Sequence, residues 1–455
     1  MQREFRIVSL YSTPSPYKPK TKLMMTELVA SNETILVIGG GISGMTTALE
    51  AAECGKEVIL IEKNPSLGGR ISQLYKYFPK LCRPSCGQEI NLRRVKANRN
   101  LRVMTMAEIV RLSGTAGDYT ATVRIHPRYV NENCTACGAC AKAVVSEIGD
   151  PHNYGMSTIK AAYLPNNMAY PQRYVLDPSI IGTEEAENAR AACPVDAIDL
   201  DQEEQTLHIH CGAVVFATGW RPYDASRIEP YGYDRYPDVV TSVELERMMD
   251  PFGPTGGKLV RPSNGEDAKN IAFIQCAGSR DRNHLSHCSR ICCMASLKQT
   301  TYLSEQFGED AGASATIYYI DIRTIDRFED FEQKVRQDRK VRFVKSKVAS
   351  IVQDPDSGRP VCQGVDTHGY DRYENAHDLV VLAVGMEPGL DLASITDTGH
   401  GVALDASGFI ELDEANAGVF GAGCATNPLD VNRSVQSATA AALRAIQVVN
   451  RISAS

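Results

Sequence analysis

The most distinct hydrophobic pattern of the chain is an apolar run over residues 34–38 that ends at a cluster of glycines. The run T-I-L-V-I is typical of a strand buried on both faces, and G-G-G-I-S-G over 39–44 follows it directly. A helix is predicted over 45–54, where Gly55 is the stop signal, and a second apolar strand over 58–61. The pattern predicts a strand–helix–strand unit with a glycine-rich turn at the start of its helix.

This unit has the features of a dinucleotide-binding site. Glu62 ends the second strand about twenty residues after the glycines, the spacing at which an acid accepts hydrogen bonds from ribose hydroxyls. Glycines let the backbone approach a pyrophosphate, and the free N–H groups of a helix start attract its charge. A glycine-rich turn in an unrelated α/β protein is the less favoured alternative. The candidate cofactor-binding residues of the unit are Gly39, Gly41, Ile42, Ser43, Gly44, Glu62 and Lys63.

Three later segments complete the pattern of an FAD-binding domain. L-G-G-R over 67–70 follows the acid, two short strands over 206–219 end in A-T-G, and V-F-G-A-G over 419–423 precedes an alanine-rich helix over 434–449. Together they resemble the FAD domain of the two-dinucleotide-binding flavoproteins. The resemblance implies that the first segment lines the flavin and the last contacts the ribityl chain and the phosphates. Cys424 departs from the pattern, since many of these flavoproteins have an aspartate there that holds the ribitol. The added candidates are Gly68, Gly69, Arg70, Ala217, Thr218, Gly219, Gly421 and Gly423.

A first set of cysteines has the spacing of a ferredoxin motif. In a two-cluster ferredoxin each motif supplies three ligands to one cluster and its fourth cysteine, before a proline, to the other. All four thiols of one cluster are present, and all four positions for the other carry different residues. The pattern predicts one retained [4Fe–4S] cluster, with the ligands Cys134, Cys137, Cys140 and Cys193. The replaced ligand positions are Val144, Thr183, Ala186 and Ala189.

A second set of cysteines lies within a later strand–loop–helix unit. Apolar strands are predicted over 271–275 and 317–320, but the turn after the first reads C-A-G-S-R and lacks the glycine pattern that binds nucleotide phosphates. Cys288 and Cys292 are expected on one face of the following helix. The set could hold a second cubane, consist of buried apolar thiols, or contain a redox-active pair. Its members are Cys276, Cys288, Cys292 and Cys293.

Composition narrows the class of protein. A chain of 455 residues is too long for one compact core, and its net charge of −7 does not favour binding to nucleic acid. No apolar window reaches the length of a membrane-spanning helix. The 14 cysteines suit clusters in a reducing compartment better than disulfides. Cys82 and Cys86 favour an interpretation as packed thiols over redox-active thiols beside the flavin.

These patterns predict an α/β, two-dinucleotide-binding-domain flavoprotein, with a Rossmann-like FAD domain, a second Rossmann-like domain and a ferredoxin-like insertion. Residues 1–31 are predicted to be a disordered N-terminal extension. The FAD domain is expected over 32–126, 204–264 and 377–455, the [4Fe–4S] insertion over 127–203, and the second domain, with the non-standard cluster site, over 265–376.

Several longer strings are identified with a known family. Y-F-P-K-L-C over 77–82, F-I-Q-C-A-G-S-R-D over 273–281 and C-S-R-I-C-C over 288–293 resemble the A-subunit family of the heterodisulfide reductases. Within it, the chain is most similar to the A-subunit of the quinone-interacting membrane-bound oxidoreductases, a match also carried by the segments 128–131, 160–165, 319–324 and 428–436.

The resemblance implies FAD, a second [4Fe–4S] cluster on the second set of cysteines, and a multi-subunit complex. The implied partners are a second flavin/iron–sulfur subunit, a membrane haem subunit that handles quinone, and adenylylsulfate reductase. The expected location is cytoplasmic and peripheral at the inner face of the membrane. No membrane span of its own and no nucleic-acid partner are expected.

Three functions follow as alternatives. The favoured one is an electron-transfer subunit without catalytic acids or bases, which exchanges electrons between the quinone pool and adenylylsulfate reductase in dissimilatory sulfur metabolism. The second is the A-subunit of another heterodisulfide reductase-like complex, either sulfur-oxidising or linked to NAD(P)H as a disulfide reductase. The third is a scaffold whose cysteines bind structural zinc.

Overall fold

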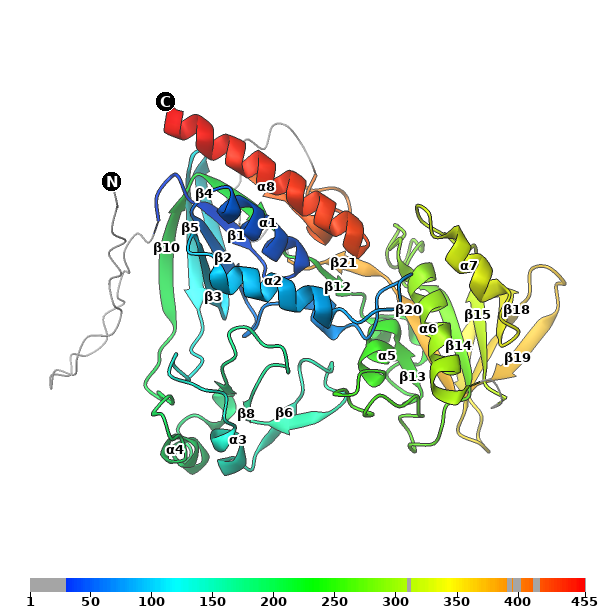
Figure 1. Ribbon diagram of the computed structural model, residues 1–455. Helices are drawn as coiled ribbons and strands as arrows, with labels where there is room; N and C mark the ends of the chain where they lie inside the picture. The colour runs from blue at the N-terminus through cyan, green and yellow to red at the C-terminus, as the bar shows by residue number, and fades with distance from the viewer. Residues whose placement is uncertain (1–29, 309–311, 391–394, 396–401, 412–417, 455) are drawn as a thin grey trace.

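The computed structural model describes residues 30–308, 312–390, 395, 402–411 and 418–454 (Figure 1). The predicted N-terminal extension lies outside the described residues, apart from its last two positions. Among the described helices, none combines the length and the apolar character needed to cross a membrane.

A five-stranded parallel sheet forms the centre of the first domain, in the order β22-β11-β1-β2-β3. Its helical layer consists of α1 (Ile42–Glu53) and α8 (Val431–Ala454), which lie side by side on one face of the sheet (Figure 1). Both helices pack small buried side chains against the strands, which places the start of α8 beside the start of α1. The strands are β1 (Ile35–Ile38), β2 (Val58–Glu62), β3 (Leu101–Thr105), β11 (Ala213–Phe216) and β22 (Val419–Gly421).

The other face of this sheet packs against a three-stranded antiparallel sheet in the order β10-β5-β4. Its strands are β4 (Ala107–Thr115), β5 (Asp118–Ile125) and β10 (Gln205–Cys211). Ile125 pairs with Gln205, so the chain between these neighbouring strands leaves and re-enters the sheet at one edge. The remaining helix of this part is α2 (Ser85–Ala97), after the short turn η1 (Gly69–Gln73).

The segment between β5 and β10 has a small apolar core of its own. Figure 1 shows it below the parallel sheet, with α3 and α4 at its outer end. The core holds both Val144 and Ala189, two of the replaced ligand positions. The elements are α3 (Ala139–Ala143), β6 (Glu147–Gly149), β7 (Thr158–Lys160), β8 (Ala162–Tyr163), β9 (Val175–Leu176), η2 (Pro178–Ile180) and α4 (Glu184–Ala191).

A second five-stranded parallel sheet, in the order β13-β20-β14-β15-β16, forms the second domain. Its strands are β13 (Val239–Thr241), β14 (Asn270–Ala277), β15 (Ser314–Tyr319), β16 (Val341–Lys345) and β20 (Leu379–Val384). One face is covered by α5 (Ser242–Met248), α6 (Cys292–Phe307) and α7 (Glu329–Arg336). The other is covered by η3 (Ala225–Arg227), η4 (Glu229–Tyr231) and the antiparallel strands β17 (Ser350–Gln353), β18 (Pro360–Val365) and β19 (Arg372–Ala376).

This sheet corrects two expected domain boundaries. The apolar run over 379–384 was expected to return the chain to the FAD domain, but β20 pairs with β13 and β14 inside the second sheet. Residues 239–248, also expected in the FAD domain, form β13 and α5 of the second domain. The chain crosses between the domains through β12 (Trp220–Pro222) and β21 (Met386–Pro388), which pair with each other. An apolar run specifies a buried strand, whereas the sheet that it joins depends on distant partners.

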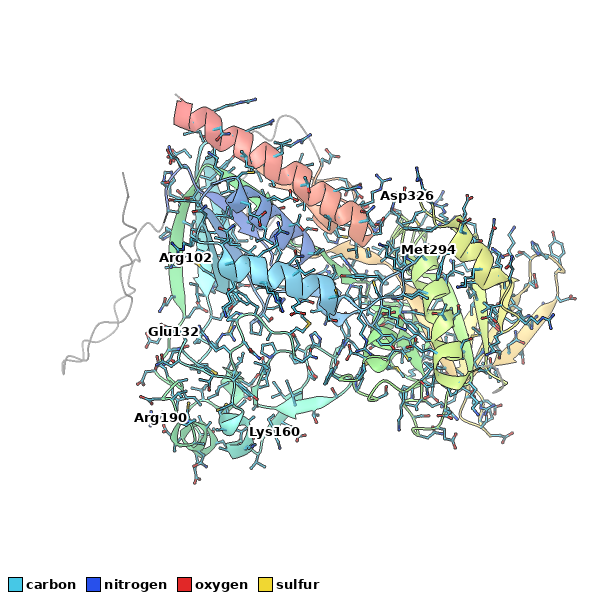
Figure 2. All side chains as sticks on the ribbon, in the orientation of Figure 1. Arg102, Glu132, Lys160, Arg190, Met294 and Asp326 are labelled. Atoms are coloured by element: carbon cyan, nitrogen blue, oxygen red, sulfur yellow. The ribbon has the colours of Figure 1, made fainter. Side chains whose placement is uncertain are left out.

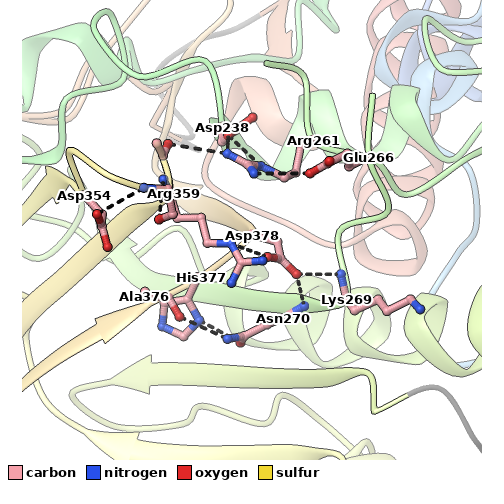
Figure 3. Close-up of polar contacts among 12 residues, drawn as sticks. Asp238, Arg261, Glu266, Lys269, Asn270, Asp354, Arg359, Ala376, His377 and Asp378 are labelled. Carbon is pink, nitrogen blue, oxygen red and sulfur yellow. Dashed lines mark hydrogen bonds and ion pairs between the residues drawn. The ribbon is translucent and has the colours of Figure 1, made fainter. Parts of the chain in front are cut away.

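Two buried aspartates secure the strands of the second sheet at their start (Figure 3). Asp378 accepts hydrogen bonds from the backbone N–H groups of Lys269 and Asn270, at 2.9 and 2.8 Å, just before β14. Asp238 pairs with Arg261 at 2.8 Å, and both side chains are buried. The charges that folding removes from water therefore have partners, as buried carboxylates require.

Candidate flavin and iron–sulfur sites

The turn between β1 and α1 has no room for side chains at two of its glycines. A Cβ at Gly39 would lie 2.4 Å from the carbonyl oxygen of Ala217, and a Cβ at Gly44 would lie 1.7 Å from the carbonyl oxygen of Gly39. No side chain caps α1 at Gly41. The N–H groups of the first turn are therefore available to an anion, as a pyrophosphate site requires.

Glu62 lies at the end of β2 with its carboxylate against this turn. One carboxylate oxygen accepts a hydrogen bond from the N–H of Gly40 at 2.5 Å, and the other accepts one from the N–H of Asn64 at 2.8 Å. Burial raises the pKa of Glu62, and these hydrogen bonds oppose the increase. The neighbouring candidate Lys63 is exposed. Glu62 is thus fixed where an acid could accept ribose hydroxyls.

The other predicted flavin segments converge on the same turn. The N–H of Gly68 donates to the carbonyl of Gly40 at 2.9 Å, and a Cβ at Gly69 would lie 2.8 Å from the Cα of Gly41. At the start of η6 (Gly423–Ala425), a Cβ at Gly423 would lie 2.0 Å from the hydroxyl oxygen of Ser43. Gly421 ends β22, beside the 217–219 segment that follows β11. FAD fits this arrangement, because backbone from five separate segments lines the start of α1.

Arg70 connects this region to the ferredoxin-like segment. Its guanidinium donates to the hydroxyl of Tyr154 at 3.0 Å and to the carbonyl of Trp220 at 3.2 Å, and lies 5.6 Å from the centre of each ring. Tyr170, also from that segment, exchanges hydrogen bonds with 66–67 through its backbone. Neither tyrosine carries a local motif, so the sequence alone did not predict these contacts. They place the insertion directly against the flavin segments.

Glu62→Gln is expected to weaken FAD binding by about tenfold or more, since a hydrogen bond to a charged group contributes about 1.5–3 kcal/mol. The test is the dissociation constant of FAD from fluorescence quenching with flavin-depleted protein. Glu57→Gln is the matched control, because Glu57 is exposed just before the same strand. Equal affinities of the two variants would contradict the role of Glu62.

The first set of cysteines surrounds one cavity in the insertion. Cys134, Cys137, Cys140 and Cys193 line it together with Val130, Tyr174 and Ile198. The N–H of Ala136 points to the sulfur of Cys134 at 3.4 Å, and that of Ala197 to the sulfur of Cys193 at 3.2 Å. Burial, and to a smaller extent Cys134 and Cys193, raise the pKa of Cys140 to about 11. Four thiols that disfavour each other's ionisation suit a polynuclear cation that would offset their charges.

Side chains fill the space of the lost cluster. Val144 is 2% exposed, and Ala186 and Ala189 are fully buried. Thr183, the fourth replaced position, is exposed ahead of α4. Figure 2 shows Arg190 on α4 and Lys160 on β7 around this part of the molecule. The insertion therefore packs apolar side chains where a second ferredoxin cluster would need thiolates.

The second set of cysteines also converges, from the end of β14, the loop after it and the first two residues of α6. Burial raises the pKa of Cys276, Cys292 and Cys293, and each also feels the charge of Cys288. The pKa of Cys293 reaches about 11. The expectation that Cys288 and Cys292 share a helix face was wrong, because α6 begins at Cys292. Cys288 lies in the preceding loop, where the N–H of Arg290 points to its sulfur at 3.3 Å.

A cubane spreads its four thiolates over four irons, so its ligands need not converge on one point. Within the described ranges, no group of three or more His, Cys, Asp or Glu side chains is arranged around a single metal ion. Both sets fit the donor chemistry of a cubane, with four thiols each and N–H donors directed at sulfur.

The remaining cysteines of interest lie apart from both sets. Cys82 and Cys86 are exposed, the first before α2 and the second in its first turn. Cys424 is buried in η6, where its thiol donates to the carbonyl of Leu429 at 3.3 Å.

Comparison with known proteins defines the relationship of the chain. Residues 34–86 match the family model of the FAD-dependent oxidoreductases. The chain is 38% identical over 421 residues to an iron–sulfur A-subunit, the second of its kind, of the CoB–CoM heterodisulfide reductase of Methanopyrus kandleri, covering 90% of this chain and 63% of the relative. It is 35% identical over 443 residues to the A-subunit of the ferredoxin/F420H2-dependent CoB–CoM heterodisulfide reductase of Methanosarcina acetivorans, covering 93% and 55%. The chain thus spans little more than half the length of these relatives.

Among solved structures, the chain is similar to the thioredoxin reductases of T. acidophilum and Lactococcus lactis. The TM-scores are 0.51 and 0.50, each at 14% identity; the matches cover 93% and 92% of this chain, and 100% and 98% of the respective reductase. Such low identity supports the fold alone. It confirms the predicted two-domain flavoprotein fold, and the family match confirms the predicted class of FAD oxidoreductase.

Proposed function

Since this chain is a member of the heterodisulfide reductase A-subunit family over nine tenths of its length, we propose that it is an FAD and iron–sulfur electron-transfer component of a multi-subunit complex. The observation that carries the proposal is the meeting of Cys193 with Cys134, Cys137 and Cys140 around one cavity. Cys193 lies more than fifty residues after the other three, so their meeting requires the folded insertion.

The chain holds and tunes its cofactors rather than performing bond chemistry. The glycine turn and Glu62 bind the dinucleotide, and the two cysteine sets bind one [4Fe–4S] cluster each. Bound FAD supplies the ability to exchange electrons singly or in pairs, whereas a cluster carries one electron at a time. The contacts of Arg70 with Tyr154 and Trp220 keep the insertion against the flavin segments, which shortens the path between the first cluster and the flavin.

The finer assignment follows the strings most similar to the quinone-interacting membrane-bound oxidoreductases. In such a complex this chain would exchange electrons between the quinone pool and adenylylsulfate reductase in dissimilatory sulfur metabolism. Its direct partners would be a membrane haem subunit, which handles quinone, and a second flavin/iron–sulfur subunit. It would then lie in the cytoplasm, attached to the inner face of the membrane through them. Co-purification of the tagged chain with a haem subunit from membranes, lost in a strain without that subunit, tests this assignment.

Cofactor analysis of the purified chain tests the core of the proposal. We expect about eight iron, about eight acid-labile sulfide and one FAD per chain, since each cubane holds four irons and four sulfides. The reduced protein should give EPR signals from two [4Fe–4S] clusters. Flavin without labile sulfide, or zinc in place of iron, would contradict the proposal. Four irons would assign one cysteine set to packing.

A disulfide reductase that uses NAD(P)H is the second candidate, because the second sheet is that of a nucleotide-reductase fold. The loop after β14 argues against it. It bends at Cys276, where the φ angle is +59°, and the second cysteine set occupies the place of the missing glycine motif. Rapid bleaching of the flavin by NADH in the isolated chain would support this candidate, and an unchanged spectrum would exclude it.

A further inference from the structure

The two cysteine sets differ in the groups that approach their sulfur atoms. In the described structure, the hydrogen bonds to sulfur in the first set come from backbone N–H groups. In the second set, the guanidinium of Arg280 also reaches the sulfur of Cys276, at 3.9 Å. Arg290 and Arg323 line a cavity of about 340 Å³ together with Cys288. Positive charge is therefore concentrated at the second set.

Arg280 is held rigidly in this position. Its guanidinium forms an ion pair with Asp321, whose carboxylate also accepts from Arg323 at 3.2 Å. The backbone carbonyl of Asp321 in turn faces the thiol of Cys293 at 3.9 Å. Figure 2 shows Asp326 of the following loop near Met294, at the start of α6. One short segment after β15 thus contacts both an arginine and a thiol of the set.

The loop that carries Arg280 is also closely tied to its surroundings. Arg280 has a φ angle of +56°, which non-glycine residues rarely adopt and which is found mainly where function requires it. Its N–H donates to the carbonyl of His287 at 3.0 Å. The hydroxyls of Ser279 and Ser289 lie 2.9 Å apart, and Ser289 accepts from the N–H of Met386 at 2.8 Å. The backbone therefore sustains a strained conformation that directs Arg280 at the cluster site.

We propose that Arg280 is a positioning residue that raises the reduction potential of the cluster on Cys276, Cys288, Cys292 and Cys293. A cluster with four thiolates gains one negative charge on reduction, and a fixed cation that donates a hydrogen bond to a ligand sulfur favours the reduced state. The proposal rests on the proposed function, because it requires the second cluster. The simpler interpretation is an ion pair that only joins the ends of β14 and β15, in which case the potential would not depend on Arg280.

Redox titration of the full chain, followed by EPR, separates these interpretations. We expect Arg280→Gln to lower the ratio of reduced to oxidised second cluster about tenfold at a fixed ambient potential, which corresponds to a midpoint about 59 mV lower for one electron. The signal of the first cluster and the flavin spectrum should not change. Arg282→Gln is the matched control, since Arg282 is exposed two residues later in the same loop. An unchanged midpoint in Arg280→Gln that still holds about eight irons would overturn the proposal.

Arg280→Lys covers the case in which the glutamine variant loses iron. Lysine keeps the charge but lacks the fork that spans Asp321 and the sulfur of Cys276, so a midpoint between those of wild type and a fully shifted cluster is expected. A midpoint equal to wild type would overturn the proposal. Wild-type protein with only one cluster signal would instead overturn the proposed function, and this inference with it.

Discussion

Cys193→Ala is expected to remove one of the two clusters and leave about four irons per chain. Cys193 enters the cavity of the first set from a separate stretch of chain, just after α4. Without its thiolate, one iron of the cubane has no protein ligand, and the three thiols that remain lie in an apolar cavity. FAD and the second cluster should stay, because the insertion has its own core. Iron and sulfide analysis with EPR gives the result.

Cys54→Ala is the control for this substitution. Cys54 is exposed at the end of α1 and lies in neither cysteine set, so this variant should keep all iron. If Cys193→Ala also kept about eight irons, Cys193 would not be a ligand and the interpretation of the insertion would be wrong. A loss of flavin together with the iron would show that the insertion does not fold independently of the FAD domain.

Lys298→Met is expected to destabilise the second domain by about 3–5 kcal/mol, the usual cost of leaving one buried charge without its partner. Lys298 and Glu246 form an ion pair at 2.8 Å, and both side chains are 3% exposed. Lys298 also donates to the carbonyl of Lys76 at 2.8 Å, and Glu246 accepts from the N–H of Tyr75 at 3.0 Å. The pair therefore joins α5 and α6 to a segment of the FAD domain. The free energy of unfolding from urea denaturation measures the loss.

Two further variants define what this loss means. Lys347→Met should cost no more than about 1 kcal/mol, because Lys347 and Asp281 form an exposed pair. Adding Glu246→Gln to Lys298→Met should restore much of the stability, since it removes the unpaired charge. Iron should also fall in Lys298→Met, because α6 begins at Cys292 and Cys293. A Lys298→Met variant as stable as Lys347→Met would show that the buried pair contributes little.

By itself, the sequence determined the features that depend on short spacings along the chain. The glycine turn, Glu62 and the start of α1 follow from one strand–helix–strand unit, in which chain direction and residue size leave few alternatives. The clean split of the ferredoxin ligands predicted that Cys193 would join the earlier cysteines. It also predicted that Val144 and its counterparts would not bind metal, and the structure packs three of these four positions in the interior.

Only the tertiary structure decided features that depend on contacts between distant segments. An apolar run such as 379–384 has no local signal for the sheet that it joins, and hydrogen-bonding partners far along the chain placed it in the second domain. The loop after β14 bends through strained residues, which kept Cys288 off α6 and directed Arg280 at Cys276. Spacing rules apply to regular helices and strands, whereas this loop takes its shape from hydrogen bonds to elements elsewhere in the chain.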